Sequence, residues 1–176
     1  RLMIGGKIQN YRNILKRYIR DYGENENINR AVQVLEHAKR EALATQDKTT
    51  LIGYEGMASN AYFEVLPVLI LNQKADFPFH GRNRRPPKDA VNAMLSFAYT
   101  LIANDTSAAL ETVGLDPYVG FLHTLRPGRT SLALDMMEEL RAYLGDRFVL
   151  SLINKRQITS KDFLFQGDNG VVMTDK

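Results

Sequence analysis

Residues 88–105, KDAVNAMLSFAYTLIAND, form the stretch that decides the fold, because they are apolar on most faces of a helix. Pro86-Pro87 comes directly before this stretch, and proline is favoured at the first position of a helix. A helix that is apolar nearly all round is usually buried by its neighbours. We therefore predict a buried helix over these residues at the centre of the fold.

The rest of the chain is also patterned mainly for helices. Residues 6–22 and 27–45 repeat their apolar side chains at helical spacing, and their short connection predicts an antiparallel pair. Further helices are expected over 50–71 with a kink at Pro67, and over 116–125, 130–144 and 146–156. Alternating strand patterns are almost absent before the last fifteen residues, where Asp168-Asn169-Gly170 predicts the turn of a small hairpin. The predicted class is all-α, a multi-helix bundle around a buried central helix with a short C-terminal hairpin or irregular tail.

The composition is that of one ordinary globular domain. With 176 residues, 44% hydrophobic and 24% charged, the chain is long enough for one core, and we expect a single helical domain over 1–176. No apolar run approaches the roughly 20 residues that a membrane span needs, so we expect no membrane contact. The absence of cysteine excludes disulfides and thiolate metal sites and fits a cytoplasmic protein. Since the chain opens at Arg1 without a methionine or a signal peptide, we expect it to be part of a longer protein.

Positive charge gathers in two stretches that contain no acid. The stretch FPFHGRNRRPPK, residues 77–88, carries four basic residues, and a second stretch carries two more. The basic residues are Arg82, Arg84, Arg85 and Lys88 in the first stretch, and Arg126 and Arg129 in the second. A net charge of +3 is too small to establish nucleic-acid binding by itself. These local fields indicate either solvated loops or a phosphate-binding surface.

Glu55 is a carboxylate on the apolar side of a predicted helix. At about 100° per residue it falls between Leu51 and Tyr62, whereas Glu64 lies on the solvent side. A buried carboxylate is costly unless a cation or several donors satisfy it. Glu55 therefore needs a partner, which the pattern leaves open between a metal ion and an arginine or tyrosine side chain.

Three further residues could complete a metal site with Glu55. His123 lies in GFLHTLRPGR beside the second basic stretch, and Asp135 and Glu138 are three residues apart on one face of the predicted helix 130–144. Carboxylates and one imidazole, without sulfur, suit a hard divalent cation such as Mg²⁺ or Mn²⁺. The sequence thus contains a candidate His/carboxylate site.

Each of these residues also has an ordinary explanation. Asp135 and Glu138 share a polar side opposite Leu132, Met136 and Leu140, which is typical of a helix on the protein surface. For the acids alone this pattern favours solvent exposure, and a single histidine is more often structural than a ligand.

Four segments, in this order and spacing, closely resemble the CRISPR-associated integrase that captures new spacers. They are GYEGMASNAYF, RNRRPPKDAVNAMLSFAYTL, GLDPYVGFLHTLRPGRTSLALDMMEELR and LINKRQI. The resemblance covers nearly the whole chain and corresponds to the C-terminal helical domain of that family. It implies a β-rich N-terminal domain that would precede Arg1.

The resemblance assigns roles to the candidate residues. It places the family's metal-binding glutamate on Glu55, its histidine on His123 and its last acidic ligand on Glu138, with Asp135 as a neighbouring acid that assists. The ion would be Mg²⁺ or Mn²⁺. The basic residues of both stretches would hold DNA phosphates.

The resemblance also implies an activity and partners. The expected protein is a metal-dependent DNA integrase and endonuclease that joins the 3′-hydroxyl of captured double-stranded DNA to the CRISPR repeat by phosphoryl transfer. It would act as a homodimer with a small adaptation partner protein. The alternative is a non-catalytic helical module that binds nucleic acid and uses its acids in structural ion pairs. A third possibility is a metal-dependent phosphohydrolase acting on small phosphate compounds.

Overall fold

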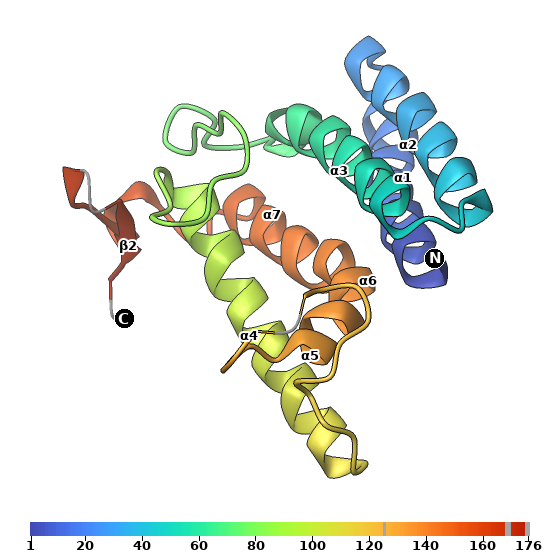
Figure 1. The fold of residues 1–176 in the computed structure, drawn as a ribbon. Helices are drawn as coiled ribbons and strands as arrows, with labels where there is room; N and C mark the ends of the chain where they lie inside the picture. Colours follow the sequence, from blue (N-terminus) through green and yellow to red (C-terminus); the bar gives the residue numbers. More distant parts are fainter. Residues whose placement is uncertain (125, 168–169, 175–176) are drawn as a thin grey trace.

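The structure is a computed structural model that describes residues 1–124, 126–167 and 170–174. The N-terminal half is a layer of three helices that lie side by side (Figure 1). They are α1 (Leu2–Tyr22), α2 (Glu26–Ala44) and α3 (Lys48–Val65), followed by the 3₁₀ turn η1 (Leu66–Leu69). The predicted antiparallel pair and the helix that changes at Pro67 are confirmed.

The C-terminal half is built on one long helix, α4 (Ala90–Thr112), which ends in the projecting tip at the bottom of Figure 1. A series of shorter elements then returns along it. These are α5 (Ser131–Met136), α6 (Glu138–Leu140), the π-helical turn η2 (Arg141–Asp146), α7 (Arg147–Asn154) and the 3₁₀ turn η3 (Ser160–Asp162). The chain finishes in strands β1 (Phe163–Phe165) and β2 (Val171–Met173), which pair antiparallel with Leu164 opposite Val172.

The two halves meet along α1. This helix packs on α2 and α3 on one side and on α6 and η2 on the other. Ile8, Tyr11 and Leu15 are fully enclosed, and the Tyr11 ring stacks on Tyr62 of α3 with centroids 4.0 Å apart. Aromatic stacking of this kind adds to the stabilisation from buried area. The core therefore runs through α1 as well as through the start of α4.

The predicted all-α class is confirmed, with the short C-terminal hairpin as the one sheet among the described residues. The turn predicted at Asp168-Asn169 lies outside those residues. We predicted that the helix over 88–105 is buried. Residues 90–95 are buried, whereas Phe97 and Leu101 are 52% and 47% exposed. No helix in the described part of the chain is long and apolar enough to cross a membrane.

The helix predicted over 116–125 is wrong for the described residues of that segment, which form turns, bends and irregular backbone. Asp116 accepts a hydrogen bond from the amide of Tyr118, which makes a local turn instead of a helix cap. The amides of Phe121 and Leu122 donate to the carboxylate of Asp135, so they have no need of helical carbonyl partners. A tertiary acceptor thus replaces the helical hydrogen bonds in this loop.

Asn92 anchors the first basic stretch to α4. It is fully buried, and its side-chain oxygen accepts hydrogen bonds from the Asn83 amide at 3.0 Å and from Arg82 at 2.7 Å. Its amide group donates to the Gly81 carbonyl at 2.9 Å and to Asp89, the cap of α4. Every polar atom of this side chain is therefore used to hold the loop before α4.

Replacing Asn92 with leucine should lower the free energy of unfolding by about 3 kcal/mol, because several buried polar groups lose their partner. Urea denaturation measures the change. Asn104→Leu, at an exposed position of the same helix, is the matched control and should stay within about 0.5 kcal/mol of wild type. Equal effects of the two substitutions would contradict the anchoring role.

Candidate active site

Two of the predicted site carboxylates meet at one lysine that the sequence analysis did not single out. The ammonium group of Lys7 contacts Oε1 of Glu55 and lies 2.8 Å from Oε2 of Glu138. Lys7 comes from α1, Glu55 from α3 and Glu138 from α6, so three separate helices supply the cluster. The partner that Glu55 requires is, in this structure, a salt bridge.

Lys7 is 3% exposed, which is rare for a lysine. Burial alone lowers its pKa, but the neighbouring Tyr11, Glu138 and Glu55 outweigh burial and leave the pKa above its ordinary value. Next to it, a Cβ atom on Gly6 would lie 2.5 Å from the carboxylate of Glu139. The missing side chain at Gly6 therefore leaves room for the carboxylate of Glu139, the residue next to Glu138.

Glu55 lies at the edge of the cluster. Its side chain is 26% exposed, so it is less buried than the helical pattern predicted. Ser59, one turn along α3, donates a hydrogen bond of 2.9 Å to the oxygen that contacts Lys7. Burial raises the pKa of Glu55, but the charge and hydrogen bond of Lys7 outweigh burial and lower the pKa overall. A Cβ atom on neighbouring Gly56 would meet nothing within 4 Å, so the surface beside Glu55 is open.

Glu138 is the deeply buried carboxylate, at 4% exposure. Besides Lys7 it pairs with Arg141, whose Nη1 lies 3.0 Å from its second oxygen. The exposure expected for a surface helix is therefore wrong for Glu138 and for Asp135, which is fully buried, whereas Met136 and Leu140 are exposed. The acids face inward because Lys7 and Arg141 form ion pairs with Glu138 there and the loop amides donate to Asp135.

Asp135 organises the loop that carries His123. Its two carboxylate oxygens accept the backbone amides of Phe121, Leu122 and His123 at 2.7 to 2.9 Å. Burial raises the pKa of Asp135, but the Leu122 amide, the His123 ring and the other amides outweigh burial and lower it overall. The carboxylate thus stays ionised and fixes the loop around it.

Asp135 also sets the tautomer of His123. Nδ1 of the histidine lies 2.6 Å from Oδ1 of Asp135. An ionised carboxylate can only accept, so Nδ1 carries the proton and Nε2 keeps its lone pair when the ring is neutral. A carboxylate behind a histidine ring is the usual support for a metal-ligating histidine.

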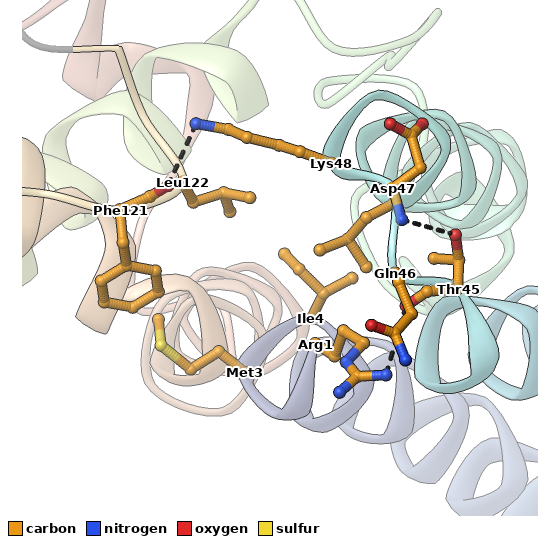
Figure 2. Close-up of a pocket in the computed structure, with 10 residues that line it drawn as sticks. Arg1, Met3, Ile4, Thr45, Gln46, Asp47, Lys48, Phe121 and Leu122 are labelled. Carbon is orange, nitrogen blue, oxygen red and sulfur yellow. Dashed lines mark hydrogen bonds between the residues drawn. The ribbon is translucent and has the colours of Figure 1, made fainter.

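The loop is held from its other side by α3. Figure 2 shows Lys48 reaching across to the backbone carbonyl of Phe121, to which it donates a hydrogen bond of 3.0 Å. The two residues help to line a pocket of about 260 Å³ between the loop and the start of α1. A Cβ atom on Gly120 would lie 2.8 Å from Asp135, so only glycine lets the loop close over this carboxylate.

The site therefore has two parts, one with two glutamates on a lysine and one with a histidine on an aspartate. Among the residues that the structure describes, no three His, Asp or Glu side chains are placed so that they hold a metal ion together. The donors still suit such an ion, because two carboxylates already converge on a cation and His123 has Nε2 available. These donors fit a divalent ion, and in this structure the ammonium group of Lys7 lies between the two glutamates.

Next to the cluster lies an arginine-lined groove of about 330 Å³. Arg82, Arg84 and Arg85 come from the predicted basic stretch, and Arg141 joins them from η2. The Tyr99 ring contacts two of these groups, with the guanidinium carbons of Arg82 and Arg141 at 5.3 and 5.2 Å from its centroid. Arg141 thus connects the groove to Glu138.

The six predicted basic residues have different surroundings. Arg84 and Arg85 are exposed at the groove, whereas Arg82 also donates to Asn92 and to Ser96, and burial lowers its pKa. Lys88 and Arg126 are exposed and Arg129 is half-buried, and none of these three lines the groove. Only half of the predicted set is therefore gathered beside the acids.

A fourth carboxylate near the site, Asp146, was not indicated by the sequence. It is fully buried at the end of η2 and accepts a hydrogen bond from the Tyr99 hydroxyl. Burial raises its pKa from 3.8 to about 6, although Tyr99, Tyr62 and Arg141 oppose the change.

Lys7 and Arg141 were not predicted from the sequence either. The signal for Lys7 was its place four residues before the buried Tyr11, on the apolar face of its helix.

The raised pKa of Asp146 predicts a pH dependence of stability. Because the folded protein holds this proton more tightly than the unfolded chain, stability falls as the pH rises from about 4 to about 6. Asp146→Asn removes the titrating group, so the variant does not lose this stability as the pH rises. The free energy of unfolding of the variant, relative to that of wild type, should therefore rise by about 2 kcal/mol between pH 4 and pH 7. Urea denaturation at both pH values measures this difference in unfolding free energy. The same difference at both pH values would contradict a buried carboxylate with a raised pKa.

Fold and site together define an all-α domain in which buried acids and a supported histidine lie beside a basic groove. The family model described as CRISPR associated protein Cas1 matches residues 1–176. CRISPR-associated endonuclease Cas1 1 of Chlorobaculum tepidum is 49% identical over 178 residues, which cover 99% of this chain and 52% of that relative. The chain therefore belongs to the Cas1 family, and the resemblance in its four segments is confirmed.

Solved structures give the same result for the fold. A chain of a Cas6-RT-Cas1–Cas2 complex matches with a TM-score of 0.83 and 26% identity, over 98% of this chain and 19% of that chain. A casposase bound to integration product matches with a TM-score of 0.78 and 26% identity, over 98% of this chain and 49% of that chain. The chain spans about half the length of the first curated relatives it matches, at 52% and 53% of their length.

Proposed function

We propose that residues 1–176 are the helical catalytic domain of a metal-dependent DNA integrase and endonuclease of CRISPR adaptation. The observation that carries the proposal is the convergence of Glu55 and Glu138 on one buried cation, close to an arginine-lined groove. Family membership supports it, because the curated relatives are named CRISPR-associated endonucleases. The reaction would join the 3′-hydroxyl of captured DNA to the CRISPR repeat by phosphoryl transfer.

Glu55, Glu138 and His123 would hold the ion, which we propose to be Mg²⁺ or Mn²⁺. When bound, a divalent ion polarises the scissile phosphate and offsets charge on the attacking and leaving oxygens. The carboxylates would supply oxygen ligands and His123 would supply Nε2. Glu55 comes from α3, Glu138 from α6 and His123 from the loop that Asp135 of α5 holds, so the packing of these elements sets the distances between the three ligands.

Asp135 acts through His123 and not on the DNA. Its carboxylate is fully buried and accepts four hydrogen bonds from the loop, one of them from the His123 ring. It therefore keeps the ring in one orientation and keeps the proton on Nδ1. Of the four residues predicted to be catalytic, Asp135 is best described as the one that positions another.

The groove arginines would hold the DNA backbone. Arg84 and Arg85 are exposed and free to approach phosphates, and Arg141 lies between the groove and Glu138. Guanidinium groups bind phosphate oxygens in pairs and without regard to base sequence. Lys88, Arg126 and Arg129 would extend the contact along double-stranded DNA outside the groove.

The partners are proposed from the family. A matching chain comes from a complex that contains Cas2, and another comes from a casposase bound to integration product. We infer that this protein acts on double-stranded DNA with 3′ ends, as a homodimer joined to a small adaptation partner protein, in the cytoplasm.

His123→Ala should reduce strand transfer by the full chain, assayed with its partner protein, by more than about 100-fold. Removing even a supporting group of a metal site costs 10–100-fold, and His123 is proposed as a ligand. Glu55→Gln and Glu138→Gln should behave alike, while DNA binding is kept. His37→Ala, at a histidine side chain 51% exposed on α2, is the control. Strand transfer at the wild-type rate by His123→Ala would exclude the proposed site.

Arg84→Ala combined with Arg85→Ala should weaken DNA binding without a base preference. The slope of log affinity against log salt should become shallower by about 2, because each phosphate contact contributes about 0.9. Fluorescence anisotropy at several salt concentrations measures this slope. Arg30→Ala, at an exposed arginine of α2, should leave the slope unchanged. An unchanged slope in the double variant would place the DNA elsewhere.

The ion pairs of Lys7 favour a second candidate function. A lysine that satisfies both glutamates is what a non-catalytic nucleic-acid-binding module with structural ion pairs would contain. Calorimetric titration with Mn²⁺ separates the two. Binding that is lost in Glu55→Gln supports the enzyme, and the absence of binding supports the module.

A further inference from the structure

Lys7 is placed where a cation between the two glutamates belongs. Its ammonium group contacts Glu55 and lies 2.8 Å from Glu138, and the side chain is 3% exposed. Two carboxylates so close to each other repel unless a positive charge separates them. Lys7 is therefore the group that lets Glu55 and Glu138 come together without a metal ion.

The same contact keeps the site incomplete. Glu138 is held by Lys7 on one oxygen and by Arg141 on the other, while His123 is held by Asp135. Among the described residues these acids and the histidine do not form a three-ligand cluster. Both oxygens of Glu138 are thus engaged with cations of the protein itself.

A lysine is suited to an ion pair that has to break when a metal ion binds. Its charge is a compact ammonium on a flexible four-carbon stem, whereas arginine binds carboxylates through a rigid two-pronged group. A divalent ion at the glutamates would repel the ammonium group at this distance. The two cations cannot both keep their present contacts.

We propose that Lys7 is an internal cation that pairs the two glutamates in the metal-free protein and competes with the divalent ion for them. The inference rests on the metal site of the proposed function and adds a positioning residue that sets the metal affinity. Loading the site requires Lys7 to release at least one of the glutamates. Lys7 thus makes the metal-free cluster stable and metal binding weaker than the ligands alone would allow.

Mn²⁺ titration of the full chain by calorimetry tests the competition. Lys7→Met has a similar shape and no charge, and it should bind Mn²⁺ at least about tenfold more tightly than wild type. Thermal unfolding gives a second readout, because a ligand that binds only the folded state stabilises it more when it binds more tightly. At equal Mn²⁺ concentration the unfolding midpoint of Lys7→Met should rise more than that of wild type.

Two further variants serve as controls. Lys39→Met changes a half-buried lysine of α2 that donates to Gln9 and lies outside the cluster, so its Mn²⁺ affinity should equal that of wild type. Lys7→Arg keeps the charge and should bind Mn²⁺ no more tightly than wild type. A gain in Lys7→Arg equal to that in Lys7→Met would overturn the proposal, since packing and not charge would then be the cause.

Lys7→Met leaves two glutamates facing each other, so it can be unstable without metal. In that case the proposal expects Mn²⁺ to restore the helical circular dichroism spectrum, and failure to restore it overturns the proposal. Unchanged or weaker Mn²⁺ binding by folded Lys7→Met also overturns it, while leaving the metal site of wild type intact. Absence of Mn²⁺ binding in wild type and Lys7→Met alike removes the metal site and the competition together.

Discussion

The arrangement of the helices depends on the two ion pairs that the ammonium group of Lys7 makes. This group joins α1 to a carboxylate on α3 and to another on α6, in a place almost closed to water. A charge in such surroundings is tolerated only with well-placed partners, and removing one partner leaves the others uncompensated. The three helices must therefore keep their relative positions. Gly6 lies at the same contact, where its lack of a side chain leaves room for the Glu139 carboxylate of α6.

Most helices could be predicted from the sequence because their apolar periodicity is local. α1, α2 and α3 follow that pattern, and so does the start of α4. The loop that contains His123 could not be predicted in this way. Its amides are satisfied by Asp135, which lies twelve to fourteen residues further along the chain, and no local pattern records such a partner. The aspartate-proline start of 116–125 was a genuine local signal that a tertiary acceptor overrode.

The candidate site shows the same division between local and tertiary information. Helical periodicity singled out Glu55 as a residue in need of a partner, and the partner proved to be Lys7. Periodicity misplaced Asp135 and Glu138, because a polar stripe was taken to face solvent. Here the polar stripe faces inward and Met136 and Leu140 face outward. Only the resemblance to a family indicated that these acids belong with Glu55, since neither charge nor spacing separates an inward acid from an exposed one.

The π-helical turn η2 separates the part of the chain that carries Glu138 from α7, and side chains are buried on both sides of it. Glu138 faces the interior before the turn, and Val149 and Ile153 do so after it. A π turn contains one residue more than the α-helical spacing allows, so side chains beyond it are displaced by about 100° around the axis. The length of Arg141–Asp146 therefore sets which residues of α7 face the core. Removing one residue there would rotate Glu138 and the apolar residues of α7 relative to each other, so this turn is constrained by its length as the site is by its chemistry.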